Sequence, residues 1–407
     1  MVEDGGVPTP PAEELDPGYR VALLDWIACA IGGANERASR SARAAADGLS
    51  GRVLAAATAG HVLDFDDTYA PGLAHLSAPT APAALLVAAE LDATAGDALA
   101  AYAAGFEAMG ALARASHPAL YERGFHPTAV CGTVGSAVAS ALLLGEESSD
   151  HVEVATRLAL VQAGGLRRAF GSDAKSLQVG AAAAAGVTAA RLAAAGASAS
   201  EDLATGPGGF EEAFGASYPS SHAGASVKDN WIKAYPCCLQ THSAIEAAWA
   251  GRERVARGNA ALTVTVHPRA RQAAPYDDVL DGLQAKFSIP YTVAYTLLRG
   301  PPSDPRNFRA VDDEARALAR ERIRISEDVT MPENGAALGQ EGTEIARVDA
   351  ATGSPARPMS EDELTRKLDL LGASHLAGAL DDLAVSAREL VALWNPQSAG
   401  GPPFANA

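Results

Sequence analysis

The sequence has few aromatic residues for its length. Phe, Trp and Tyr make up 5% of its 407 residues, whereas hydrophobic residues together make up 48%. The chain is therefore too hydrophobic to be disordered. Its length is enough for two or three domains with a sizeable core, built mainly from small aliphatic side chains.

Basic residues are also scarce. The 32 Lys and Arg residues are outnumbered by 49 Asp and Glu residues, which gives a formal net charge of −17. This excess argues against nucleic acid as the main partner, because phosphate binding needs a basic surface. No uninterrupted apolar run of about 18 residues occurs, so we expect no membrane span.

Cysteine is rare and has no metal-binding pattern. The four cysteines form no CxxC pair and no zinc spacing, which points to a cytoplasmic protein. Cys29 and Cys131 lie in apolar stretches and are expected in the core. Residues 1–17 are acidic and rich in proline, unlike a secretion or transit signal, and are expected to form a flexible tail.

The first half of the chain has the pattern of tightly packed helices. Its stretches rich in Ala, Gly and Leu lack β-branched alternation, and several are apolar on every side. They end at Gly, Pro or Ser/Asp clusters. Helices are expected over residues 21–32, 81–91, 98–115, 133–144, 152–163 and 179–195.

The composition changes near residues 213–225, where Gly, Ser, Pro and His cluster as in a linker. Beyond it the pattern mixes strands of period two with helices, which predicts a small α+β domain of antiparallel strands. The expected strands are 262–267, 323–325 and 343–349, and the expected helices are 243–257 and 289–298.

The end of the chain returns to a helical pattern over residues 360–394. Ser360 resembles an N-cap that precedes an acidic first turn. We therefore expect a mainly α protein: a flexible tail, a large helical domain, and a smaller α+β domain. Their expected limits are 1–17 for the tail, 18–225 with 358–407 for the helical domain, and 226–357 for the α+β domain.

Three carboxylates stand close together in the segment His61–Tyr69. Asp64, Asp66 and Asp67 are costly if buried and unremarkable if exposed. Taken alone, the pattern favours a solvated turn in which Asp67 or Thr68 caps the next helix.

Two further polar groups stand at the starts of apolar helices. His126 precedes a small-residue helix, whose N-terminus favours an anion; a capping or core histidine is the alternative. Lys175 opens an alanine-rich helix, although Lys is rarely buried without a partner; a surface lysine is the alternative.

The remaining clusters lie at or beyond the linker. Lys233 is near the domain junction, where it can close on an anionic substrate. The adjacent Cys237 and Cys238 are either a redox pair or two ordinary thiols. Pro290 begins a helix and places Tyr291 in its first turn, as an acid, a hydrogen-bond donor or a structural residue.

Each cluster has a structural explanation on its own, but together they supply what an anionic-substrate pocket between domains needs. Lys and His would bind carboxylates, and the set includes an acid/base pair. A metal site is not expected at His61, Asp64, Asp66 and Asp67, because side chains one to three residues apart on a helix mostly point in different directions.

The same motifs, in this order, resemble the 2-methylcitrate dehydratase (MmgE/PrpD) family. The resemblance covers residues 21–394, nearly the whole chain. The motifs that carry it are His61–Thr68, His75–Pro79, Gly124–Thr128, Gly132-Thr133, Lys175, Gly208–Phe210, Lys233–Cys238 with His242, and Lys286–Tyr291.

The resemblance implies a large helical domain with a smaller α+β lid, a homodimer, and chemistry without cofactor or metal on small polycarboxylates. Known members dehydrate 2-methylcitrate, decarboxylate cis-aconitate or epimerise iminodisuccinate. It implies catalytic roles for His126, His75, Asp64, Lys175 and Tyr291. It implies substrate contacts for Lys233, Thr68, Cys238 and Gln178.

The chain departs from the family pattern in three places. Gln178 stands where His or Asn is usual, Cys238 stands where the animal decarboxylases have His, and the region between Gly33 and His61 is shorter. The primary expectation is a cofactor-independent lyase of the dehydratase type, which removes an α-proton and forms an enolate-like intermediate. The alternatives are an isomerase, epimerase or cyclase on a non-citrate substrate in specialised metabolism, a cis-aconitate-type decarboxylase, or a ligand-binding relative without activity.

Overall fold

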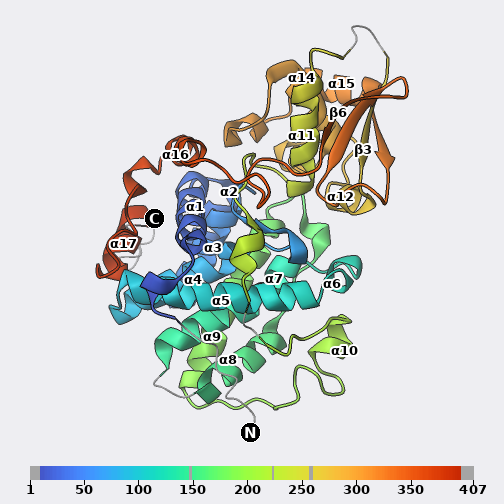
Figure 1. Cartoon of the computed structure of the whole chain (residues 1–407). Coiled ribbons are helices and arrows are strands. Elements are labelled where there is room, and N and C mark those ends of the chain that lie inside the picture. Colours follow the sequence, from blue (N-terminus) through green and yellow to red (C-terminus); the bar gives the residue numbers. More distant parts are fainter. Residues whose placement is uncertain (1–9, 146–148, 222–223, 256–259, 396–407) are drawn as a thin grey trace.

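The chain folds into a mainly α-helical structure, seen here in a computed structural model (Figure 1). The structure describes residues 10–145, 149–221, 224–255 and 260–395. Within these ranges it has 17 α-helices and six strands. The linker expected over residues 213–225 is described only in part, since residues 222–223 fall outside these ranges.

A large helical body takes up the first half of the chain. The helices expected there are present, and most extend a few residues beyond their expected limits. They are α1 (Pro17–Gly33), α2 (Arg37–Ala44), α3 (Gly48–His61), α4 (Ser77–Leu91), α5 (Ala95–Ala115), α6 (Ala119–Glu122), α7 (Pro127–Leu144), α8 (Ser149–Gln162), α9 (Ala174–Ala194) and α10 (Phe210–Phe214).

Helix α7 lies at the centre of this body and packs against α4, α5, α8 and α9. It is apolar on every side, and nearly all of its residues are buried. Gly105 of α5 faces the backbone of Gly135 in α7, so closely that a Cβ at Gly105 would collide with the Gly135 carbonyl oxygen. Small residues therefore set the distance between the central helices.

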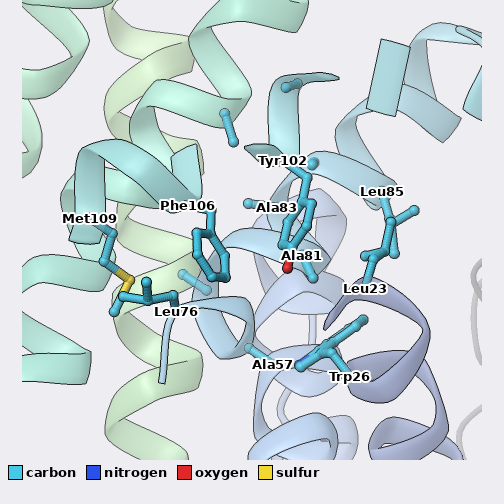
Figure 2. Packing of buried hydrophobic residues seen from close by; sticks show 14 of the residues in the cluster. Leu23, Trp26, Ala57, Leu76, Ala81, Ala83, Leu85, Tyr102, Phe106 and Met109 are labelled. Carbon is cyan, nitrogen blue, oxygen red and sulfur yellow. The ribbon is translucent and has the colours of Figure 1, made fainter. Parts of the chain in front are cut away.

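The few large side chains of the body gather in one core. Figure 2 shows Leu23 and Trp26 of α1 facing Leu85 of α4, with Tyr102 and Phe106 of α5 beside them. All five are fully buried. The rings of Tyr102 and Phe106 meet edge to face, with centroids 5.6 Å apart.

A second hydrophobic core forms around a four-stranded sheet (Figure 1, upper right). The strand order is β4-β3-β5-β6, with β3 at Leu262–Val266, β4 at Ile323–Glu327, β5 at Ala336–Gln340 and β6 at Thr343–Val348. Helix α11 packs on β5 and β6, and α14 contacts β4. The helices of this part are α11 (Leu239–Gly251), α12 (Pro268–Ala273), α13 (Gly282–Ala285), α14 (Ile289–Arg299) and α15 (Asp313–Arg322).

The sheet differs from the expected one in two ways. Strands β3 and β4 pair in parallel, not antiparallel, because residues 267–322 between them form a long crossover that contains helices. Strand β5 was not expected, because its sequence Ala-Ala-Leu-Gly-Gln has low β-propensity and no clear alternation. Its pairing with β3 and β6, not its composition, makes it a strand.

Both ends of the described chain pack on the helical body. Helix α16 (Glu361–Leu370) begins at Ser360, whose side chain forms the expected capping box with Glu363, and α17 (Ala387–Trp394) packs against α4. Of the expected flexible tail, residues 1–9 lie outside the described residues. Ala12–Glu14 instead form a short 3-10 helix against α5, with Ala12 buried.

Two helices, α7 and α9, are long and apolar enough to cross a membrane by length and composition alone. In the structure 83% of the apolar stretch of α7 is buried, as expected of a core helix. For the apolar stretch of α9 the buried share is 50%.

We expect Gly105→Ala to lower the free energy of unfolding by about 1–3 kcal/mol, because the added methyl group overpacks the α5–α7 contact. Its Cβ would also lie 2.8 Å from Ala139 Cβ. Urea unfolding followed by circular dichroism measures the effect. Gly164→Ala is the control, since a Cβ there meets nothing within 4 Å; equal stability of the two variants would contradict the packing argument.

Candidate active site

A cavity lies where the helical body meets the sheet-containing part. Both parts contribute to its wall. The body supplies Asp64, Thr68, Leu73, His75, Tyr121, His126, Phe170 and Lys175, and the second part supplies Lys233, Cys238, Leu239, Gln240, Ala273 and Phe287.

The loop that follows α3 carries the acidic cluster into the interior. The expectation of a solvated turn is wrong, because Asp64, Asp66 and Asp67 are all buried. Asp64 has a φ of 54°, in the left-handed region that Asp tolerates better than most residues. This conformation turns the chain so that successive carboxylates point to different partners.

Three buried lysines hold this loop by its backbone. Lys286 donates to the Leu63 carbonyl at 2.5 Å, Lys233 to the Asp64 carbonyl at 2.9 Å, and Lys367 to the Phe65 carbonyl at 2.8 Å. They come from three segments that are far apart in the sequence. These three consecutive carbonyls lie outside helices and strands, so they have no partner from regular secondary structure. Each receives a charge-assisted hydrogen bond from a lysine instead.

Two lysine side chains of the cavity contact the Asp64 carboxylate. Its Oδ1 accepts hydrogen bonds from Lys175 Nζ at 2.9 Å and Lys233 Nζ at 3.0 Å. Burial alone raises the pKa of Asp64, but these two ammonium groups outweigh it and hold the pKa well below its usual range. The Asp64 and Asp66 carboxylates likewise outweigh the effect of burial on Lys233 and raise its pKa.

The buried Asp66 carboxylate connects two imidazoles. Its Oδ2 lies 2.8 Å from His61 Nδ1 and 3.1 Å from His75 Nδ1, and His61 Nε2 lies 2.8 Å from Lys175 Nζ. Burial raises the pKa of Asp66, but the interactions with His61 and His75 outweigh it and lower the pKa well below its usual range. Burial lowers the pKa of His75 to about 3, and the charges of Lys175 and Lys233 add to this effect.

His126 stands at the N-cap of α7, as expected, and is buried. Its Nδ1 lies 2.7 Å from Nε2 of Gln178, which is on the first turns of α9. Burial and the nearby charge of Lys175 lower the pKa of His126 well below its usual range. Gln178 thus contacts a cavity residue without being part of the cavity wall.

Asp67 faces away from the lysines. It accepts hydrogen bonds from Ser77 N at the start of α4 and from Asn230 Nδ2. The N-cap of α4 is Leu76, so neither Asp67 nor Thr68 takes the expected N-cap position. Burial raises the pKa of Asp67 to about 8, and the charges of Asp66 and Asp25 contribute. The pKa values of the three neighbouring carboxyls therefore differ because their surroundings differ.

The structure brings most of the expected site residues together and leaves one aside. Thr68 and Cys238 line the cavity. Tyr291 does not line it: the first turn of α14 packs toward the start of α15, and the Tyr291 hydroxyl accepts a hydrogen bond from Asp312 N at 2.9 Å. Burial raises the pKa values of Cys237 and Cys238 to about 12, so both remain protonated, unreactive thiols.

Sequence reasoning missed several groups of the site. His61 and Asp66 belong to the motif His61–Thr68, which could have pointed to them as site residues. In the structure His61 interacts with both Asp66 and Lys175. Tyr121 lines the cavity and is buried, and the Arg167 guanidinium lies over its ring. Lys367 has no sequence signal, since it sits in an amphipathic, acidic surface helix.

This arrangement suits chemistry on an anion. Two ammonium groups can bind a carboxylate and stabilise negative charge that develops next to it. Two imidazoles in the same cavity can accept or donate hydrogen bonds to the reacting atoms. Phe170, Phe287 and Leu239 add an apolar part to the cavity wall.

Comparison with known proteins identifies the family. Residues 50–221 match the model of the MmgE/PrpD N-terminal domain, and residues 235–389 match that of the MmgE/PrpD C-terminal domain. The chain belongs to the MmgE/PrpD family. Among curated relatives of this MmgE/PrpD chain are two that are named cis-aconitate decarboxylase.

The two curated relatives are similar to the MmgE/PrpD chain at low identity. The human protein is 31% identical over 215 residues, which span 50% of this chain and 44% of the relative. The mouse protein is 27% identical over 340 residues, which span 75% of this chain and 68% of the relative.

One grouping in this MmgE/PrpD site has the spacing of a metal centre. Ligand atoms of His61, Asp66 and His75 lie within 4.8 Å of one another. The expectation that such side chains point apart is wrong for His61 and Asp66, because α3 ends at His61 and the loop turns back toward it. Still, the donor set opposes a cation, since Lys175 already places its ammonium group on His61 Nε2.

We expect zinc and EDTA each to leave the unfolding temperature unchanged, because an ion held only by the folded state would raise it. Differential scanning fluorimetry of the full chain provides the measurement. A rise with zinc that disappears in His61→Gln would show that the cluster binds metal.

We expect Lys367→Met to destabilise the protein by about 3–5 kcal/mol. The buried Asp25 carboxyl, whose pKa burial already raises, loses its partner and must take up a proton or remain as an unpaired charge. Lys367 Nζ lies 2.5 Å from Asp25 Oδ1, and both side chains are buried. Urea unfolding measures the loss. The double variant Asp25→Asn with Lys367→Met should recover part of it, and a double variant no more stable than the single one would contradict the assignment.

Proposed function

We propose that this chain is a cofactor-independent lyase of the dehydratase type that acts on a small carboxylate substrate. One observation carries the proposal: the ammonium groups of Lys175 and Lys233 converge on one oxygen of Asp64 inside a cavity that also contains His75 and His126. A buried double positive charge beside two imidazoles suits removal of a proton next to a carboxylate.

In the proposed reaction a base takes the α-proton, and the electron pair left on carbon delocalises into the carboxylate as an enolate. The two lysines stabilise this extra negative charge. The electron pair then expels the β-hydroxyl group, which leaves as water after it gains a proton. Asp64 keeps the two lysines fixed in place before the substrate binds.

Decarboxylation is the second candidate, and the printed names of the two relatives favour it. Here a carbon–carbon bond breaks, carbon dioxide leaves, and the electron pair remains on carbon until a proton is delivered. The same charges stabilise the same type of intermediate, so the substrate decides between the two reactions.

We further propose that residues 226–357 act as a lid on the helical body. Lys233 and Phe287 from this segment complete the cavity wall, which supports the idea that its position controls access. The strands β1 (Thr68–Tyr69) and β2 (Asn230–Trp231) pair at the boundary between the two parts. A cytoplasmic homodimer remains part of the proposal, and light scattering coupled to size-exclusion chromatography tests the dimer.

The test is turnover of a panel of substrates by the purified chain: citrate, 2-methylcitrate, cis-aconitate and small 2-hydroxy dicarboxylates. Products are identified by mass spectrometry. Deuterium uptake from D₂O at the α-carbon reports proton abstraction and separates it from a cyclisation that needs no exchange. Absence of both turnover and exchange on every compound would reject the proposal in favour of a binding protein.

We expect Lys175→Ala and His126→Ala each to lower turnover by about 10²-fold or more, because each removes a group that stabilises the transition state. Steady-state kinetics on the active substrate measures the loss. Lys228→Ala is the matched control, since Lys228 is exposed on a short 3-10 helix away from the cavity. Near-normal rates in both site variants would contradict these roles.

A further inference from the structure

The two histidines of the cavity face different partners at the same ring atom. Nδ1 of His75 faces a carboxylate, whereas Nδ1 of His126 faces a side-chain amide. A neutral imidazole carries one proton, so the partner at Nδ1 decides which nitrogen donates and which accepts. This difference assigns the two rings separate roles.

The partner of His75 is an acceptor. Two oxygens face Nδ1 of His75: the Asp66 Oδ2 at 3.1 Å and the Thr68 hydroxyl at 3.4 Å. The nearer one belongs to an ionised carboxylate, which can only accept, so the proton is assigned to Nδ1 and the Thr68 hydroxyl does not donate to it. His61 supports this independently: the Lys175 ammonium can only donate to His61 Nε2, which leaves the His61 proton on Nδ1, directed at the same oxygen. Asp64 Oδ1 faces the other nitrogen, but at 3.7 Å it is too far to accept a hydrogen bond, so Nε2 of His75 carries the lone pair.

The partner of His126 is a donor, because the Gln178 amide can take only one orientation. Its Oε1 accepts from Leu166 N at 2.9 Å, and its Nε2 lies 3.2 Å from Leu166 O. A flipped amide would place a donor against the Leu166 N–H and an acceptor against its carbonyl. The second hydrogen of Nε2 therefore points to His126 Nδ1, and the His126 proton is on Nε2.

The backbone around Leu166 is itself fixed. His126 N donates to Gly165 O, and Arg167 N donates to Gly124 O, so this segment is paired with the one that carries His126. His126 Nε2 has no hydrogen bond to any described residue, and the ring lines the cavity. The charged and titratable groups around it are Lys175, His61, His75 and Asp64.

We propose that the two rings have opposite tautomers: His75 Nε2 is the base that takes the substrate proton, and His126 Nε2–H is a hydrogen-bond donor to the enolate oxygen. Gln178 is the positioning residue that holds His126 in this form. The roles rest on the proposed function. The proton taken by His75 Nε2 yields an imidazolium that Asp66 stabilises at Nδ1, and His75 returns it to the leaving hydroxyl or to carbon.

The charges in the cavity agree with this division. Both rings are neutral in the free protein, because burial lowers the pKa of each. A neutral His126 can donate from Nε2 without giving up its proton, as neutral histidines do toward developing oxyanions. Substrate carboxylates would neutralise the Lys175 and Lys233 charges that weaken His75 as a base, so the base gains strength when the substrate is bound.

The test is the tautomer of each ring in the full chain, read by ¹H–¹⁵N NMR with ¹⁵N-labelled histidine. We expect Nε2–H for His126 and Nδ1–H for His75 in the wild-type protein. The single-residue variants His126→Asn and His75→Asn assign the signals. This readout needs no substrate, so it stands whether or not turnover is found, and Nδ1–H on His126 would overturn the inference while leaving the proposed function intact.

Gln178→Glu provides the second arm, because a carboxylate at this position accepts from Nδ1–H and inverts the His126 tautomer. We expect inversion in the spectrum and a fall in kcat of about 10²–10³-fold, the usual cost of one lost oxyanion donor, with a smaller change in KM. Gln162→Glu on α8 is the matched control, since it makes the same change at an exposed site. An inverted tautomer with unchanged kcat would overturn the catalytic role of His126.

Discussion

Compensation of buried charge around Asp64 is the constraint on which the rest of this structure depends. An acidic loop enters the interior in a left-handed conformation, and it persists there because lysines satisfy both its carboxylate and its backbone. A buried carboxylate without such partners would lose its charge or remain exposed. The same ammonium groups make the cavity positive inside a chain whose net charge is −17. The arrangement that stabilises the loop therefore also prepares the site for an anion.

Much of the architecture could be predicted because local patterns and tertiary contacts agree. Helices that are apolar on all sides, such as α7, have one stable place in a domain, and the capping box at Ser360 marks a helix start by chemistry alone. Strand β5 and the parallel pairing of β3 with β4 could not be predicted. The first depends on its neighbours, and the second depends on the path of a crossover that no local pattern encodes.

The site, too, could be predicted only in part. Motif order predicted that Lys175, Lys233, His75 and His126 share one site, and the structure places all four in one cavity wall. Burial of the Asp cluster was missed, since its cost is offset by residues more than a hundred positions away. Tyr291 shows the reverse case: its place in a first turn was correct, but the direction of its side chain depends on the packing of α14 against α15. The tautomers of His75 and His126 could not be predicted from the sequence at all, because each depends on a single donor or acceptor beside the ring.

The lysines that hold the loop also bear on how the protein is made. Leu63, Asp64 and Phe65 leave the ribosome early, but their partners are residues 286, 233 and 367, and the last lies 302 positions from Phe65. Domains generally fold from the N-terminus during synthesis, and contacts of such long sequence separation form late. The helical body can pack before then, with Lys175 of α9 already beside Asp64, but the backbone of its acidic loop lacks the last of its three lysines until α16 is made. A chain that is cut short before α16 would thus keep most of its hydrophobic core and lack the lysine that holds the loop at Phe65.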